Sequence, residues 1–218
     1  MTEVPSDKVR VIACGALARE ILAVCEQNGL GHLNLACLPA MLHNHPDKIA
    51  PAVDEAITAA RAEGVENIYV AYADCGTGGH LGMVCEKHGV ERIAGPHCYS
   101  FFWGNDDFAA RDEDDIRTFF LTDFLARQFR AFIIEPLGLD RHPELKEMYF
   151  GHYEKVAYLV QKEDPALDKA AEDAARFLGL AYERRVTGYG DLTTALAAAA
   201  SARKNEVMQS EPNSSISN

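Results

Sequence analysis

Residues 9–40, "VRVIACGALAREILAVCEQNGLGHLNLACLPA", contain the pattern that decides the fold. The apolar run 9–13 reads as a buried strand, and the segment after it has the apolar spacing of a helix. Gly29 is expected to end that helix, because glycine adopts the left-handed backbone conformation without steric cost. A second apolar run leads to Cys37, and the amphipathic segment Lys48–Glu63 predicts a second helix. The order of elements is therefore strand, helix, strand, helix (βαβα).

The same order of residues recurs in Cys75–Ser100, "CGTGGHLGMVCEKHGVERIAGPHCYS". Both stretches begin with Cys-Gly after an apolar run, continue with Val-Cys-Glu before a helix-ending glycine, and finish with a cysteine. The first and last cysteines are 23 residues apart in each copy, Cys14 to Cys37 and Cys75 to Cys98. An internal duplication explains this agreement and predicts a second βαβα unit.

A third unit, without cysteine, is predicted near the C-terminus. Strands are expected at 155–161 and 182–186, and helices at 165–178 and 191–202. The segment 116–151, which precedes this unit, reads as wholly helical. Strands that alternate with helices imply parallel sheets whose functional groups lie at the carboxyl ends of the strands.

We therefore predict an α/β protein built from two or three pseudo-repeated βαβα (Rossmann-like) units, with a helical insertion before the third. The expected boundaries are 1–66 for the first repeat, 67–152 for the second repeat with its helical extension, and 153–203 for the third repeat. Residues 204–218, rich in Ser and Asn, are expected to form a disordered tail.

The formal net charge of −12 argues against nucleic acid or an anionic membrane surface as the main partner, because both are polyanions. No apolar run approaches the roughly 20 residues that span a bilayer, and the first residues lack the order of a signal peptide. A cytoplasmic location is the resulting expectation. Six cysteines are too few for a disulfide scaffold in a chain of 218 residues, so metal binding or catalysis better explains their clustering.

Four cysteines fall where predicted strands end, and we expect them to meet at one mouth as metal ligands: Cys14, Cys37, Cys75 and Cys98. Cys25 and Cys85 lie within helical apolar patterns and are expected in the core. Zinc accepts thiolate and imidazole ligands in tetrahedral sets, and a catalytic zinc keeps one position open. An iron–sulfur cluster held by three cysteines, with one iron open to substrate, is the alternative. Buried thiols without a metal are the simpler alternative.

Other residues at the same mouth are candidates for catalysis or cofactor binding. His97, Tyr99 and Tyr189 are the catalytic candidates, since a histidine suits ligation or proton transfer and a tyrosine can act as an acid. Cofactor contacts are expected from His43, Gly15 and the "CGTGG" loop, in which Gly76, Thr77, Gly78 and Gly79 would expose backbone N–H groups to an anion. A tight turn that lets the backbone approach a ligand is the preferred explanation for this loop, and His43 could equally be a solvent-exposed loop residue.

Five motifs make the chain resemble a family of unknown function, DUF1638: "ACGALARE", "LPAMLHNHPDKI", "YADCGTGG", "RIAGPHCYSFF" and "GLDRHPELKEMYFGHYEKVAYL". The resemblance covers roughly residues 9–195. It implies an association with trimethylamine-methyltransferase-like proteins, corrinoid proteins and corrinoid-reactivating proteins, and hence with one-carbon or methylamine metabolism.

The leading functional hypothesis is a metal-dependent, zinc–thiolate enzyme, a methyltransferase, in corrinoid-linked one-carbon or methylamine methyl transfer. A corrinoid or a folate would be the methyl donor or acceptor, and a small-molecule substrate together with a corrinoid protein or methyltransferase would be the partners. Two alternatives remain open: an iron–sulfur enzyme with a three-cysteine cluster and an open iron, and a non-catalytic carrier of metal, corrinoid or methylamine.

Overall fold

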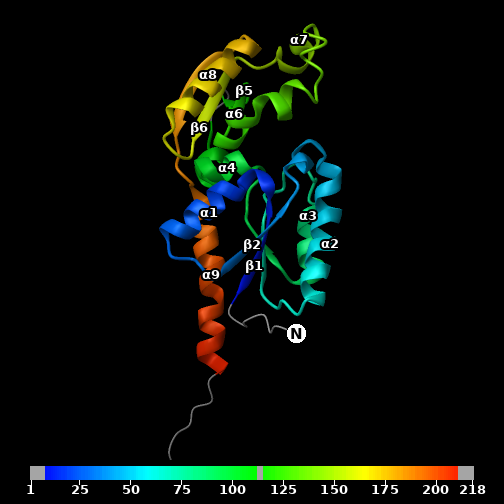
Figure 1. Ribbon diagram of the computed structural model, residues 1–218, viewed down its shortest axis with the longest axis vertical. Helices are drawn as coiled ribbons and strands as arrows, with labels where there is room; N and C mark the ends of the chain where they lie inside the picture. The colour runs from blue at the N-terminus through cyan, green and yellow to red at the C-terminus, as the bar shows by residue number, and fades with distance from the viewer. Residues whose placement is uncertain (1–7, 112–114, 211–218) are drawn as a thin grey trace, which may run out of the picture.

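The computed structural model describes residues 8–111 and 115–210, with side chains placed as far as Ser201. It contains two parallel sheets, one of four strands in the order β2-β1-β3-β4 and one of three strands in the order β5-β6-β7. Each sheet is covered by helices, and the two units follow one another along the longest axis of the molecule (Figure 1). The α/β class and the parallel sheets expected from the sequence are confirmed.

The two cysteine-bearing repeats form the first sheet together. Its elements are β1 (Val9–Cys14), α1 (Ala18–Gln27), β2 (Leu33–Leu38), α2 (Ile49–Ala62), β3 (Ile68–Ala71), α3 (His80–His88) and β4 (Glu91–Arg92). The first strands of the two copies, β1 and β3, pair with each other at the centre, and the second strands lie on the outside. Helices α2 and α3 lie on one side of this sheet, and α1 and α9 lie on the other (Figure 1).

The second sheet contains the predicted third repeat and one strand that the sequence did not reveal. Its elements are β5 (Thr118–Leu121), α6 (Asp123–Phe129), α7 (Leu145–Phe150), β6 (Lys155–Val160), α8 (Pro165–Leu178) and β7 (Ala181–Val186). The expectation that 116–151 is wholly helical was wrong, because its residues 118–121 pair in parallel with β6. Helix α8 begins at Pro165 and is capped by Gly179 in the left-handed conformation, as predicted.

Helix α4 (Cys98–Trp103) packs between the two sheets. Its Phe101 and Phe102 belong to the apolar core of the first sheet, whereas Tyr99 and Trp103 pack on an aromatic cluster over β5 and β6. Helix α5 (Asn105–Ala109) follows it directly. Alternate faces of α4 therefore join the two units.

Helix α9 (Asp191–Ser210) leaves the second sheet and returns to the first, where Leu192 and Leu196 are fully buried. It includes residues 204–210 of the segment that the sequence predicted to be a disordered tail, and 211–218 lie outside the described residues. The turn before α9 needs a glycine at position 190: its φ is +47°, and a Cβ there would collide with the carbonyl oxygens of Phe101 and Phe102.

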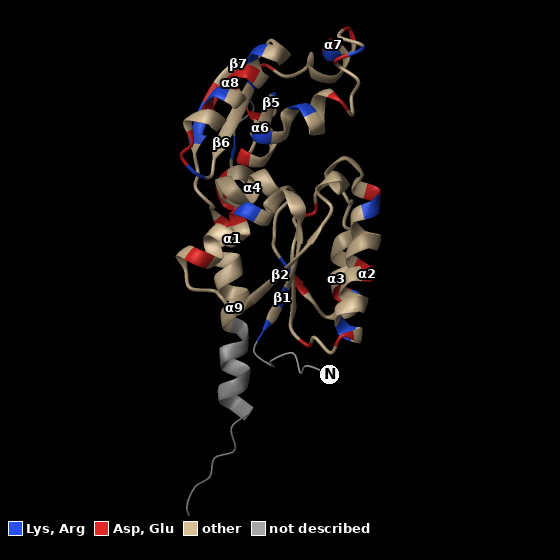
Figure 2. Cartoon of the chain, in the orientation of Figure 1, with Lys and Arg blue, Asp and Glu red and all other residues tan. Residues whose placement is uncertain are grey.

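Charged residues lie mainly on the helices and turns, and the strands of the first sheet are largely uncharged (Figure 2). The fully buried side chains include Ile12, Tyr72, Leu121 and Tyr158. Along the part of the chain that the structure describes, no helix has the length and apolar character needed to cross a membrane.

Candidate functional site

Cys14 is the last residue of β1, at the carboxyl end of the sheet, and its side chain is buried. The next residue has to be small, because a Cβ on Gly15 would approach the carbonyl oxygen of Leu38 to 2.8 Å. Gly15 thus allows the chain to turn tightly over β2 as it leaves the strand, and this turn fixes the position of the Cys14 thiol. The sequence suggested a cofactor contact for Gly15, and the structure gives it a packing role.

Cys75 lies in the loop between β3 and α3 and is the one described residue other than glycine with a positive φ, +50°. Such a conformation costs an ordinary residue about 1–2 kcal/mol. Two backbone hydrogen bonds hold the loop in place: Asp74 N–H donates to Gly95 O at 3.0 Å and Cys75 N–H donates to Pro96 O at 2.8 Å. Strain that the surroundings enforce is common at functional positions, where it aims a particular side chain.

Cys98 is the first residue of α4 and does not end a strand, contrary to the sequence prediction. Strand β4 already ends at Arg92, and the chain then curves back beside the Cys75 loop. His97 precedes the helix in an extended conformation, and the Ser100 hydroxyl donates a hydrogen bond to its carbonyl oxygen at 2.7 Å. This turn fixes the start of α4 and with it the Cys98 thiol.

These three cysteines line one enclosed cavity of about 20 Å³, called the thiol cavity below. Its walls are formed by Cys14, Ala16, Leu17, His43, Ile49, Tyr72, Ala73, Cys75 and Cys98. A void of this volume holds one water-sized guest, since a single water needs at least roughly 10–15 Å³. Thus three thiols and one imidazole, contributed by four separate segments, surround a space that suits a single small ion.

The three thiols perturb one another. Burial raises the pKa of Cys14, raises the pKa of Cys75 to about 12, and raises the pKa of Cys98 well above its ordinary value. The neighbouring thiols add to the increase at Cys75 and Cys98, because each negative charge disfavours the next. Without a cation the three sulfurs are therefore neutral, whereas a bound cation would favour their ionised forms.

Backbone N–H groups act against this increase at each sulfur. Hydrogen bonding from the amide of Ala16 lowers the pKa of Cys14, and the amide of Cys98 does the same for the pKa of Cys75. The amide of Tyr99 lowers the pKa of Cys98. Each of the three thiols thus already has a donor placed to stabilise its thiolate.

Tyr72 is a residue of this cavity that the sequence reasoning missed. It follows β3 directly, is 1% exposed, and has a buried hydroxyl without a hydrogen-bond partner among the described residues. Its pKa is raised, first by burial and then by the Cys14 thiol nearby. In the sequence, Tyr72 reads as part of an apolar run, and only the pairing of β1 with β3 shows that it lies beside Cys14.

Cys37 is not brought into the thiol cavity, although it was expected to join the other three. It pairs with Ala13 in the register of β1 and β2, whereas Cys14 pairs with Leu38. Side chains alternate between the two faces of a sheet, so Cys37 and Cys14 point to opposite faces. The Cys37 side chain is exposed, and burial still raises the pKa of its thiol.

Of the predicted histidines, His43 lines the thiol cavity and His97 does not. Burial lowers the pKa of both, and the two rings lie near enough for His97 to lower the pKa of His43 further. His97 stacks on Tyr99 at 4.8 Å between ring centroids, and Tyr99 in turn stacks on Phe120 of the second sheet at 5.1 Å. Tyr99 therefore faces the aromatic cluster between the sheets.

Tyr189 lies in the turn between β7 and α9 and packs against the core of the first sheet. Its pKa is raised by burial and then by the carboxyl groups of Glu20 and Asp123. It therefore lies near the two buried acids where the units meet, and it is not among the residues that line the thiol cavity. Its predicted catalytic role stays a prediction.

The glycine-rich loop holds an anion that belongs to the protein itself. The amides of Gly78 and Gly79 donate to the Asp74 carboxylate at 3.2 and 2.9 Å, and the Thr77 hydroxyl donates to it at 2.7 Å. Burial alone would raise the pKa of Asp74, but these hydrogen bonds outweigh it and lower the pKa. Two of the N–H groups expected to face a ligand are therefore already used.

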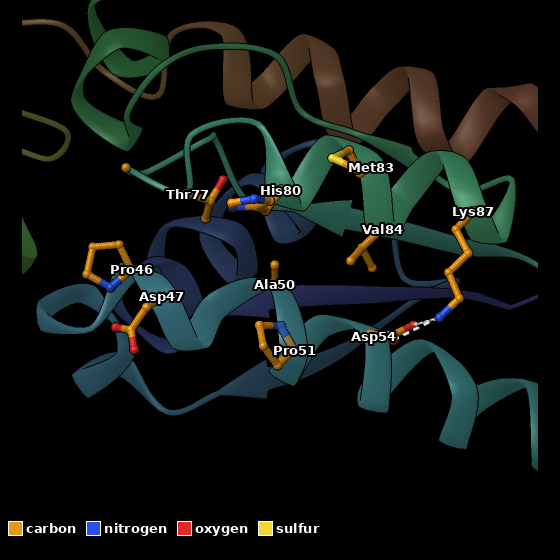
Figure 3. Close-up of a pocket in the computed structure, with 11 residues that line it drawn as sticks. Pro46, Asp47, Ala50, Pro51, Asp54, Thr77, His80, Met83, Val84 and Lys87 are labelled. Carbon is orange, nitrogen blue, oxygen red and sulfur yellow. Dashed lines mark hydrogen bonds and ion pairs between the residues drawn. The ribbon is translucent and has the colours of Figure 1, made fainter.

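Gly76 and Thr77 instead border an open groove of about 850 Å³ between α2 and α3. In Figure 3, Met83 and Val84 of α3 face Ala50 and Pro51 of α2 across this groove. An ion pair between Lys87 and Asp54, at 2.9 Å, lies at the end remote from Thr77 (Figure 3). The groove and the thiol cavity lie on either side of the contact between the Cys75 loop and the segment 43–50.

Within residues 8–111 and 115–210, no three His, Cys, Asp or Glu side chains already have the arrangement that ligates a metal ion. The fold and the cavity define the class as a Rossmann-like α/β protein with a cysteine-lined site. The model of one family, described as "Protein of unknown function (DUF1638)", matches residues 37–196. The chain therefore belongs to the DUF1638 family, as its motifs predicted; the match includes Cys75 and Cys98 and begins after Cys14. The comparison with curated proteins gives no match.

Proposed function

We propose that this protein is a zinc–thiolate enzyme that binds one ion through Cys14, Cys75 and Cys98. The observation that carries the proposal is the convergence of three thiols from three separate loops on one cavity of about 20 Å³. Zinc prefers such thiolates in tetrahedral sets, and His43 lines the same cavity as a fourth donor that an incoming ligand could replace. Binding would require the side chains to turn towards the centre of the cavity.

The volume of the cavity favours a single ion over an iron–sulfur cluster. A four-iron cluster carries its irons and sulfides as one bulky body, and the walls would have to separate to admit it. The cysteines also lie at the carboxyl ends of parallel strands, where α/β proteins place their ligands. A brown protein with absorbance near about 400 nm would reverse this preference, because cluster charge transfer absorbs there.

The proposed reaction is methyl transfer linked to a corrinoid, which is the context that the family resemblance implies. A cation bound to sulfur keeps a thiolate ionised at neutral pH, and a thiolate is the nucleophile that such a reaction needs. The thiolate attacks the methyl carbon, and the bond from that carbon to its donor breaks with the electron pair staying on the donor.

Metal analysis of protein purified without added metal tests the proposal. We expect close to one zinc per chain in the wild type and in Cys85→Ser, whose buried cysteine lies in α3 and does not line the cavity. Cys75→Ser should lose most of its zinc. Less than about 0.3 metal per chain in the wild type, with unchanged zinc affinity in Cys75→Ser, would refute the site, because one site per chain should fill.

A non-catalytic metal carrier is the second candidate, and the enclosed shape of the cavity favours it. Four protein donors around a space for one ion leave no room for a substrate unless the segment 43–50 moves. The two candidates differ in one measurement: an enzyme loaded with zinc should remove the methyl group from methylcobalamin in the presence of a thiol, whereas a carrier should not.

A further inference from the structure

Tyr72 has a polar group that the metal-free cavity leaves unused. The side chain is 1% exposed, and its hydroxyl is buried without a hydrogen-bond partner among the described residues. An unpaired hydroxyl in the interior is destabilising, and a phenylalanine of almost the same shape would avoid the cost. The presence of a tyrosine here therefore points to a state of the site in which the hydroxyl has a partner.

The pairing of the strands identifies that partner. Ala13 of β1 and Ala71 of β3 are the last paired residues of these neighbouring parallel strands. Cys14 and Tyr72 follow them directly, so both lie at the same edge and both line the thiol cavity. The Cys14 thiol is also the largest influence after burial on the raised pKa of Tyr72, as expected for adjacent groups.

The charge of the sulfur decides whether the hydroxyl has a partner. A neutral thiol is a weak acceptor, so the Tyr72 hydroxyl gains little from it. A thiolate is negatively charged, and hydrogen bonds to ionised acceptors are roughly twice as strong as those to neutral ones. The hydroxyl is thus an unused donor beside a neutral Cys14 and a matched donor beside an ionised one.

We propose that Tyr72 is a positioning residue of the thiol centre, whose hydroxyl donates a hydrogen bond to Sγ of Cys14 when that sulfur is a metal-bound thiolate. This inference rests on the metal site proposed above. Outer residues that hydrogen-bond metal ligands fix the orientation of those ligands and tune the metal. Cys14 already receives the amide of Ala16, so Tyr72 would be its second donor.

Binding of Co²⁺ to the full chain tests the inference, with Tyr72→Phe compared with the wild type and with Tyr69→Phe. Tyr69 is a matched control: it belongs to the same strand, is 7% exposed, and its ring lies near Glu91 and Arg92, away from the thiols. We expect Tyr72→Phe to bind Co²⁺ about 10- to 100-fold more weakly, the usual effect of removing such a partner. Its sulfur-to-cobalt absorption should shift to longer wavelength, because a thiolate without the hydrogen bond holds its electrons less tightly.

Thermal unfolding of the metal-free proteins separates this role from simple packing. Metal-free Tyr72→Phe should melt at the same temperature as the wild type or higher, since it loses only an unpartnered hydroxyl, and Tyr69→Phe should keep the affinity and the spectrum. If Tyr72→Phe binds Co²⁺ with wild-type affinity and spectrum, or loses affinity only in step with a lower metal-free melting temperature, Tyr72 does not position Cys14. If the wild type binds no Co²⁺, both the metal site and the role of Tyr72 fall.

Discussion

Replacing Gly190 by alanine should loosen the attachment of α4 to α9. Gly190 has φ +47°, and a Cβ at this position would collide with the carbonyl oxygens of Phe101 and Phe102. Those oxygens belong to the backbone of α4, so they cannot move aside as a flexible side chain would. Gly188 provides a matched control in the same turn: its φ is +61°, and a Cβ there would meet nothing within 4 Å.

The cost of each variant follows from these two environments. An L-residue in the left-handed region costs about 1–2 kcal/mol, and this term applies to Gly188→Ala and Gly190→Ala alike. The collision adds about 1–3 kcal/mol of overpacking to Gly190→Ala alone. We therefore expect Gly190→Ala to lose about 2–5 kcal/mol of unfolding free energy, and the difference between the two variants isolates the collision.

Urea unfolding followed by far-ultraviolet circular dichroism measures both losses, and Co²⁺ binding reports on the site. Because α4 begins with Cys98, a displacement of α4 should weaken metal binding in Gly190→Ala and leave it unchanged in Gly188→Ala. Equal stabilities of the two variants would refute the close packing of α4 on this turn. A destabilised Gly190→Ala with wild-type affinity would show that the position of Cys98 does not depend on this contact.

Three further substitutions test the packing and the buried polar groups. Leu192→Ala should lower the unfolding free energy in urea by about 2–5 kcal/mol, because Leu192 is fully buried, whereas Leu22→Ala, at a side chain 57% exposed, should change it little. Tyr158→Phe removes a buried 2.8 Å hydrogen bond to Asp123 and should cost about 1.5–3 kcal/mol in the same assay; a smaller loss than in an exposed control such as Tyr149→Phe would count against that bond. Burial raises the pKa of Glu20, whose Oε2 has no partner among the described residues, so the folded state holds its proton more tightly than the unfolded state. Wild-type stability should therefore fall as the pH rises from the ordinary glutamate pKa through the raised one, and Glu20→Gln should remove this slope and be about 1–3 kcal/mol more stable at pH 7; a less stable variant would contradict the assignment.

The sequence was sufficient for most of the fold because the strands of a parallel sheet are continuous apolar runs and the helices between them have clear ends. Gly89 and Gly179 end α3 and α8 in the left-handed conformation, as their positions predicted. Strand β5 was missed because it is only four residues long and joins directly to the apolar helix α6. In a short apolar run, the strand and helix periods cannot be told apart without the partner strand.

The candidate site depended on information of two kinds. The convergence of Cys14, Cys75 and Cys98 follows from sequence order, since loops at the carboxyl ends of parallel strands share one edge. The exclusion of Cys37 and the inclusion of Tyr72 depend on register, in which a shift of one residue reverses the direction of every side chain. Register is set by pairing between segments, and the spacing of cysteines within one segment does not reveal it.

The two repeats diverge where the site requires it. In the first copy, β2 continues to Leu38, so regular pairing with β1 holds Cys37 on the face opposite Cys14. In the second copy, β4 stops at Arg92, and the released chain turns back so that Gly95 and Pro96 accept hydrogen bonds from the Cys75 loop. The equivalent cysteine, Cys98, is thereby placed above the end of β3 and not along the edge strand. A duplicated unit with four similarly spaced cysteines thus yields a three-thiol cavity because one edge strand of the pair is short.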